Sequence, residues 1–328
     1  MSLQAIGDTI AIMTPFLLAA TGGLFSSLAG MLNIALEGLM LNSAFFSVVF
    51  TVATGNLFLG VLAGVAATLL LTAVFGGIAL GLRANIFICG LATNLLAAAL
   101  SIVLSFKIYG QTGSVTFPGM PTLEPLVIPG ISSVPVLGEL LSGHNLLTYL
   151  SWVLLGAAYL VIYRLPFGMR LRAVGQDPEA SRALGINVRG MHIAALLISG
   201  FACALGGASL SLTLGAFVPN VTSGRGWIAL VIIYLGNRTP LGILIGSLVF
   251  GFVEYLSNLL QTTSSIPAGL LLAMPFFATV LALILYAVLE SRLARRRAPL
   301  GAGAPAAEAG AEAAQEPAEG PPEGSPER

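Results

Sequence analysis

The sequence predicts an all-α protein of the membrane, a polytopic bundle of about 8–10 transmembrane helices, some of them broken or re-entrant. Only 9% of the 328 residues are charged, where a soluble domain has about 25%. Hydrophobic residues make up 56%, and the mean hydropathy is +0.94. Twelve of the charged side chains follow residue 289, which leaves 16 for everything before it. A soluble globule is therefore excluded, because its surface would offer too few polar groups to water.

Apolar runs long enough to cross a bilayer follow one another along the chain, since a crossing needs about 20 residues. No basic residue precedes Arg83, so we expect the first run to be a retained span, not a secretory signal. The runs cover residues 10–30, 33–54, 57–82, 86–106, 146–163, 191–213, 216–236, 240–261 and 267–289. They make nine crossings if 216–236 passes through the membrane and eight if it re-enters.

The basic residues predict the orientation of these runs. One arginine cluster surrounds a single loop and another follows the last run, and the positive-inside rule places both in the cytoplasm. The clusters consist of Arg164, Arg170, Arg172, Arg182 and Arg189, and of Arg292, Arg295, Arg296 and Arg297. If 216–236 crosses, 11 basic residues lie inside and 2 outside. We therefore expect an odd number of crossings, with the N-terminus outside and the C-terminus cytoplasmic.

Composition divides the chain into a membrane domain and a tail. The membrane domain covers residues 1–289, with a cytoplasmic loop at 165–190 and an external loop at 107–145. The external loop holds five prolines, and we expect it to act as a lid or a docking surface. Residues 290–328 are rich in Ala, Pro and Glu, which predicts a disordered tail.

The cytoplasmic loop predicts a helix of two turns with a defined start and stop. Asp177 is suited to the N-cap, Pro178 to the first turn and Gly185 to a left-handed end, while Glu179 complements the helix dipole. Ala180, Ala183 and Leu184 share one face. Such a short helix needs something to pack on. It is either a connector on the membrane surface or a rigid knob that inserts into a partner protein.

The chain itself has no phosphate-binding loop. Its single lysine, Lys107, does not belong to a GxxxxGK[ST] sequence. The cysteines Cys89 and Cys203 lie in separate apolar runs, so we expect no metal site. A pump built on this chain would need a second subunit to bind ATP.

Three sequence blocks resemble bacterial ABC-importer permeases of the superfamily that serves branched-chain amino acids, ribose-type sugars and nucleosides. Residues 172–188 resemble the coupling-helix segment of that family. Leu32–Met40 and Ser223–Leu230 resemble two further blocks, and the combination is most similar to the nucleoside and simple-sugar branch. The resemblance covers about residues 8–289. Relatives commonly carry a charged pair just before the Leu32–Met40 block, but Phe25–Gly30 holds no charged residue. If that pair contacts the ATPase, the contact is weakened or replaced in this chain.

The resemblance implies that this chain is a transport subunit, not an enzyme, and binds no cofactor itself. ATP and Mg would bind to a partner ABC ATPase. The other implied partners are a second homologous permease, forming a heterodimer, an extracytoplasmic solute-binding lipoprotein, and the lipid bilayer of the bacterial inner membrane; no nucleic acid is expected. The residues implied to contact the ATPase are Gly175, Asp177, Pro178, Glu179, Ala180, Arg182, Ala183, Leu184 and Gly185.

Polar and aromatic residues within the runs are candidates for a solute pathway. They are Asn33, Glu37, Phe87, Asn94, Arg225, Trp227, Glu254 and Asn258. Polar solutes need hydrogen-bond partners, and Phe87 or Trp227 could provide a stacking surface. Arg225 lies between two glycines, as in broken helices that border cavities, although an interfacial Arg–Trp anchor explains it equally well.

Structural roles compete with this interpretation. Glu37 is either part of the pathway or a partner for the backbone N–H groups at a helix N-terminus. Interhelical hydrogen bonding accounts for Asn94 slightly better than a pathway does, and the reverse holds for Glu254.

The sequence thus predicts the transmembrane subunit of an ATP-driven importer that moves nucleosides or ribose-type and simple sugars by alternating access. The alternative is a proton-coupled secondary transporter that uses Glu37 and Glu254 as proton carriers. That alternative leaves the capped cytoplasmic helix without a role. An intramembrane enzyme lacks support, because the HExxH and GxSxG sequences are absent.

Overall fold

The computed structural model describes residues 3–127, 142–263 and 267–297. Within these ranges the regular structure consists of helices and two short strands joined by irregular segments, and eight helices are long and apolar enough to cross a membrane. The prediction of an all-α polytopic bundle is confirmed. The helices are α1 (Leu3–Leu28), α2 (Leu36–Thr54), α3 (Leu57–Gly76), the π-helical η1 (Gly77–Gly81), α4 (Ile86–Tyr109), α6 (Leu146–Arg164), α7 (Pro166–Gln176), α8 (Pro178–Ala183), α9 (Val188–Leu214), α10 (Arg225–Leu235), α11 (Pro240–Thr263), α12 (Ala268–Leu272) and α13 (Met274–Arg297).

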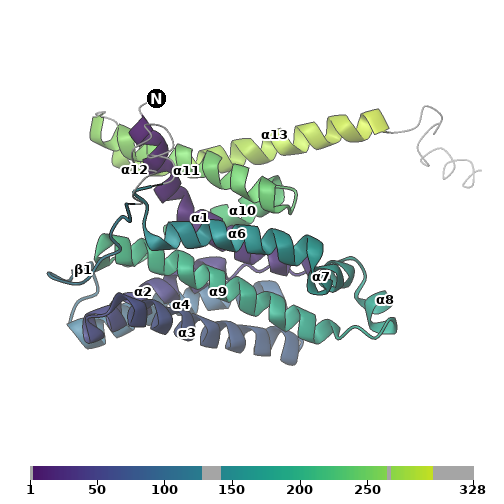
Figure 1. Ribbon diagram of the computed structural model, residues 1–328, viewed down its shortest axis with the longest axis horizontal. Helices are drawn as coiled ribbons and strands as arrows, with labels where there is room; N and C mark the ends of the chain where they lie inside the picture. Colours follow the sequence, from purple (N-terminus) through teal and green to yellow (C-terminus); the bar gives the residue numbers. More distant parts are fainter. Residues whose placement is uncertain (1–2, 128–141, 264–266, 298–328) are drawn as a thin grey trace, which may run out of the picture. The chain divides into compact units, whose positions relative to one another are not determined.

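Three helices form the centre of the bundle. Most residues of α1, α2 and α9 are buried, whereas most residues of α3, α4, α6 and α11 are not. Helix α9 lies between α6 and the pair α3 and α4 (Figure 1). Small residues lie where helices or helix ends approach closely: Gly64 packs on Ser47, Gly200 on Thr72, and Gly242 on Gly236. Small residues allow this because packing, and not a hydrophobic force, drives helix association in lipid.

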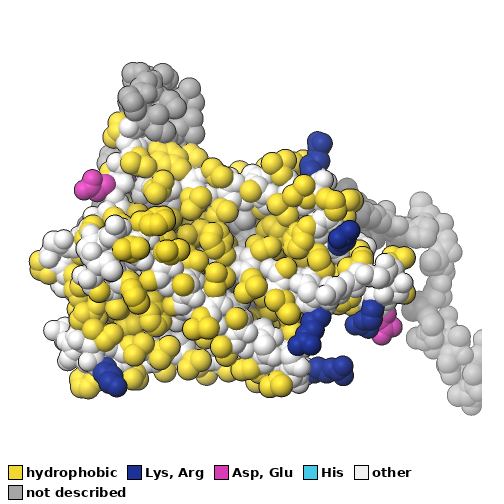
Figure 2. Space-filling view, turned by 60° about the horizontal axis from the view of Figure 1, so that its bottom comes forward, with side chains coloured by type: hydrophobic (Ala, Val, Ile, Leu, Met, Phe, Trp, Pro, Cys, Tyr) yellow, Lys and Arg dark blue, Asp and Glu magenta, His cyan; other side chains and the backbone are white. Residues whose placement is uncertain are grey.

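The apolar exterior matches the composition. Figure 2 shows a face dominated by hydrophobic side chains, with most of the basic side chains gathered toward one end. In Figure 1 the same end carries α7 and α8. A surface of this kind suits lipid, which offers no hydrogen bonds to polar side chains.

The 216–236 run is broken. It starts with strand β2 (Ala216–Phe217), which pairs antiparallel with β1 (Val115–Thr116), and its helical part α10 has 11 residues. That helix is about 16 Å long, half of a membrane crossing. Its end lies beside the start of α11, where Gly236 contacts Gly242. After α9 the chain therefore comes back across the bundle in two pieces, an irregular segment followed by the half-helix α10. It then starts α11 at the end of the bundle where α9 starts.

The second run is also interrupted. Residues 31–35 are not α-helical, and α2 begins only at Leu36. Gly30, which precedes the break, contacts Gly175 of α7. The first residues of α2, Leu36, Glu37 and Gly38, are buried, so the N-terminus of this helix lies inside the bundle.

The chain divides into two compact units, residues 1–283 and 284–328. The described part of the second unit is the C-terminal portion of α13, which ends at Arg297. The rest of the predicted tail, residues 298–328, lies outside the described residues, as does the 128–141 part of the external loop.

Candidate functional site

The cytoplasmic loop forms the capped helix that the sequence predicts. Asp177 Oδ1 accepts hydrogen bonds from the backbone N–H groups of Glu179 and Ala180, both at 2.9 Å. Pro178 is the first helical residue. Gly185 ends the segment with φ +80°, in the left-handed region that glycine adopts without strain.

Helix α8 exposes the face that was expected to need a partner. Ala180, Ala183 and Leu184 are exposed, and Leu184 has 80% of its surface accessible. The inward-facing residue of the helix is Ser181, which is buried. Within the described residues, α8 therefore has no cover over its apolar face.

A glycine contact joins this loop to the central helix α1. Gly175, at the end of α7, packs directly on the backbone of Leu28 and Gly30. A side chain at Gly175 would overlap the Leu28 carbonyl. Helix α7 thus links α8 to the end of α1 by direct backbone packing.

Glu37 caps the half-helix α10 from another helix. Its Oε1 accepts hydrogen bonds from Thr222 Oγ1 at 2.6 Å and Gly224 N at 2.8 Å, and its Oε2 accepts one from Gly226 N at 2.7 Å. Helix α10 has no side-chain cap of its own. Of the two roles that the sequence left open for Glu37, the geometry favours the structural one, a carboxylate at the positive end of a helix.

Asn33 and Asn94 hold the irregular segment before α2. Asn33 Nδ2 donates to Ser199 Oγ at 2.9 Å, while its Oδ1 accepts from Ala35 N at 3.0 Å. Asn94 Nδ2 donates to the Ile34 carbonyl at 3.0 Å, and its Oδ1 accepts from Gly38 N at 2.7 Å. Both amides satisfy backbone groups that a continuous helix would have paired itself.

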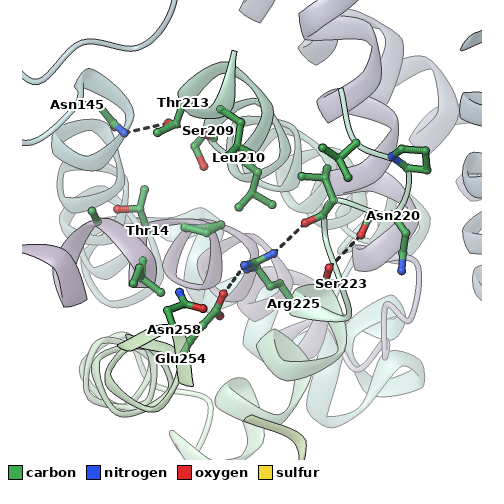
Figure 3. Close-up of a pocket in the computed structure, with 17 residues that line it drawn as sticks. Thr14, Asn145, Ser209, Leu210, Thr213, Asn220, Ser223, Arg225, Glu254 and Asn258 are labelled. Carbon is green, nitrogen blue, oxygen red and sulfur yellow. Dashed lines mark hydrogen bonds and ion pairs between the residues drawn. The ribbon is translucent and has the colours of Figure 1, made fainter. Parts of the chain in front are cut away.

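A cavity of about 430 Å³ lies between α1, α6, α9, α11 and the loop before α10 (Figure 3). Three of the predicted pathway residues line it: Arg225, Glu254 and Asn258. The other five do not. Asn33, Glu37 and Asn94 have the structural partners described above, and Phe87 and Trp227 are partly exposed elsewhere, at 47% and 39%.

An ion pair forms one wall of this cavity. Arg225 Nη2 donates to Glu254 Oε1, and Arg225 Nη1 donates to the Val221 carbonyl at 2.8 Å. The two side chains are 20% and 11% exposed. Pairing lowers the cost of keeping both charges away from water. Figure 3 shows Arg225 pointing across to Glu254, with Asn258 one turn farther along the same helix.

The sequence did not single out the other polar groups of the cavity. They are Thr14, Asn145, Ser209, Thr213, Asn220 and Ser223. Asn145 Nδ2 donates to Thr213 Oγ1 at 3.4 Å, which joins α6 to α9 across the top of Figure 3. Asn220 and Ser223 adopt positive φ, at 56° and 44°, in the turn that leads into α10. Pro219 and Gly224, the neighbours of Asn220 and Ser223, are typical turn residues and could have indicated this part of the cavity. Nothing in the sequence marks the hydroxyls of Thr14, Ser209 and Thr213, which lie on long apolar helices.

Comparisons with known proteins agree with this architecture. Residues 5–289 match the family described as branched-chain amino acid transport system, permease component. The guanosine ABC transporter permease protein NupQ of Bacillus subtilis (strain 168) is 34% identical over 84% of this chain and 89% of its own. The nucleoside ABC transporter permease protein NupC of Lactococcus lactis subsp. cremoris (strain MG1363) is 30% identical over 86% of this chain and 91% of its own.

A third relative and a solved structure are also similar to this chain. The putative glucose ABC transporter permease protein TsgC13 of Haloferax volcanii is 31% identical over 79% of this chain and 78% of its own. A solved structure, of a putative metal-chelate type ABC transporter in an inward-facing conformation, aligns with a TM-score of 0.50 and 18% identity, covering 86% of this chain and 85% of that one. At this identity the alignment supports the fold alone.

Proposed function

Because this chain belongs to the family of branched-chain amino acid transport permeases, we propose that it is the transmembrane subunit of an ABC importer for nucleosides or simple sugars. The proposal extends to this chain the solutes for which its relatives are named, guanosine, nucleosides and glucose. The structural observation that carries it is α8, a helix capped by Asp177 whose apolar face is uncovered. A subunit that only transports needs such a contact with one that hydrolyses ATP.

The proposed complex has three further proteins. An ABC ATPase binds ATP and Mg and receives α8; a second homologous permease completes a heterodimer; a solute-binding lipoprotein delivers the solute from outside the inner membrane. In this arrangement Asp177, Pro178, Glu179, Ala180, Arg182, Ala183, Leu184 and Gly185 form the contact with the ATPase, and Gly175 passes its movement on.

The proposed mechanism is alternating access driven through the contact of Gly175 with α1. Closure of the ATPase would push α8, and α7 would carry that push to the backbone of Leu28 and Gly30. Helix α1 also provides Thr14 and Pro15 to the wall of the cavity. One helix, α1, therefore connects the cytoplasmic contact to the cavity.

The test is an exchange of an exposed leucine for a charge. Leu184→Asp should abolish uptake and substrate-stimulated ATPase activity in the reconstituted complex, because it introduces a charge into a buried interface. Leu184→Met is the matched control, since it keeps this 80% exposed position apolar and of similar size. Intact uptake in Leu184→Asp, Glu179→Arg and Gly185→Val would refute the coupling role of α8.

The proton-coupled alternative finds less support in the geometry. Both oxygens of Glu37 accept hydrogen bonds from the segment that starts α10, and Glu254 is paired with Arg225. These partners give each carboxylate a structural role. Uptake in vesicles with a proton gradient and no ATPase subunit would favour the alternative; dependence of uptake on ATP would exclude it.

A further inference from the structure

The cavity beside Arg225 offers hydrogen-bonding groups that nothing else in the described structure uses. Glu254 Oε1 pairs with Arg225, but Glu254 Oε2 and the side-chain amide of Asn258 have no hydrogen-bond partner within the described ranges. The amide of Asn220 is likewise without a partner there. The first two groups are four residues apart on α11, so they lie on the same helix face.

The one cation of this wall is not available to a solute. Arg225 Nη1 and Nη2 are engaged with the Val221 carbonyl and with Glu254, and Arg225 Nε is buried and faces no acceptor. The free groups are therefore one carboxylate oxygen and neutral amides. A solute carboxylate or phosphate would meet the Glu254 charge with no free cation to compensate it.

Stacking partners for a nucleobase are missing as well. None of the described residues that line the cavity is aromatic; its apolar wall comes from side chains such as Ile12, Leu210 and Pro219. Proteins that bind unpaired bases commonly stack them on aromatic rings. Hydroxyl groups, in contrast, can donate to a carboxylate, as ribose does in dinucleotide-binding folds.

We propose that this cavity recognises neutral polyhydroxylated solutes by their hydroxyl groups, through Glu254 and Asn258, and does not recognise a nucleobase. The inference rests on the proposed function and narrows it. The sugar is the part of a nucleoside that the permease recognises, so purine and pyrimidine ribonucleosides bind alike, and loss of the sugar hydroxyls weakens binding.

The test measures weak binding to the permease and ATPase in nanodiscs, without the lipoprotein, by saturation-transfer NMR. The probes are adenosine, uridine and 2′,3′-dideoxyadenosine. Adenosine and uridine should bind with similar affinity and receive saturation mainly at ribose protons. Dideoxyadenosine should bind about tenfold more weakly, the change expected from one lost hydrogen bond to a charged group.

A pair of amide variants on α11 separates recognition from folding. Asn258→Leu removes a cavity amide that has no structural hydrogen bond in the described ranges and should weaken adenosine binding severalfold. Gln261→Leu removes an amide from the same helix outside the cavity and should leave binding unchanged. Glu254→Gln should reduce the preference for adenosine over dideoxyadenosine.

Two outcomes would overturn the inference: equal binding of adenosine and dideoxyadenosine, or saturation centred on the base. Its failure is distinguishable from that of the proposed function. If the complete transporter with lipoprotein shows ATP-dependent uptake of nucleosides or sugars while these binding results fail, the hydroxyl site alone is wrong. If uptake itself is absent for both solute classes, the proposed function is wrong.

Discussion

The carboxylate of Glu37 accepts a hydrogen bond from the backbone N–H of Gly226 at 2.7 Å, although 189 positions separate the two residues. Glu37 belongs to the first turn of α2, and Gly226 to the first turn of α10. The N-termini of two helices therefore meet at one carboxylate inside the bundle. Each N-terminus carries a partial positive charge, and the carboxylate stabilises both.

Glu37→Ala should destabilise the protein by about 2 kcal/mol or more, because it leaves the buried Gly226 N–H and the partly buried Gly224 N–H without an acceptor. Thermal unfolding in detergent measures the effect. Glu37→Gln retains one acceptor oxygen and should cost less than Glu37→Ala. Equal stability of all three proteins would contradict the capping role.

Replacing Arg225 alone should be far more harmful than replacing it together with Glu254. Arg225→Gln leaves the mostly buried Glu254 charge unpaired, which typically costs about 3–5 kcal/mol for a buried pair. The double variant Arg225→Gln with Glu254→Gln removes both charges and should recover most of that loss. A double-mutant cycle on unfolding midpoints measures the coupling; additive effects would show that the pair contributes nothing.

Gly175→Ala should destabilise the junction of α7 with α1, since the new methyl group would overlap the Leu28 carbonyl. Overpacking of this kind costs about 1–3 kcal/mol. Gly156→Ala in α6 is the control, because nothing lies within 4 Å of a methyl group there, and it should be neutral or stabilise the helix by up to about 1 kcal/mol. Gly175→Ala should therefore lower the unfolding midpoint, whereas Gly156→Ala should leave the midpoint unchanged or raise it.

Asp177→Ala should weaken α8 by about 1 kcal/mol, the usual contribution of an N-cap. Because α8 has six residues, this is enough to loosen it. Asp177→Ser retains an acceptor and should behave like the native protein. The readout is substrate-stimulated ATPase activity of the complex, with basal activity of the ATPase as control; equal stimulation in both variants would contradict the requirement for a rigid α8.

The features that could be predicted are those that depend on residues close together in the sequence. Run length predicted the spanning helices, and the order Asp177, Pro178 and Gly185 predicted both ends of α8, because caps are set within one turn. Gly224 and Gly226 suggested a break in the 216–236 run, with an interfacial Arg–Trp anchor as the equal alternative. These are local properties, and tertiary packing did not override them.

The contents of the cavity depended on tertiary structure instead. Arg225 and Glu254 were each noted, but nothing in their separation of 29 positions indicated that they pair. Thr14 and Ser209 lie on continuous apolar helices, where a hydroxyl more often bonds to its own helix. Asn33 and Asn94 were candidates for the pathway as polar residues within apolar runs, and for Asn94 interhelical hydrogen bonding was slightly favoured; that both satisfy the backbone of the irregular 31–35 segment could not be read from the sequence.

The meeting of α2 and α10 also sets an order of events during synthesis. Thr222, Gly224 and Gly226 are translated well after Glu37, and at about 5–20 residues per second the delay is on the order of 10–40 s. Throughout that interval the carboxylate of the second span has none of these partners. The early spans thus reach their final arrangement only after the half-helix has been made, so the packing around the start of α2 is completed only once translation has passed Gly226.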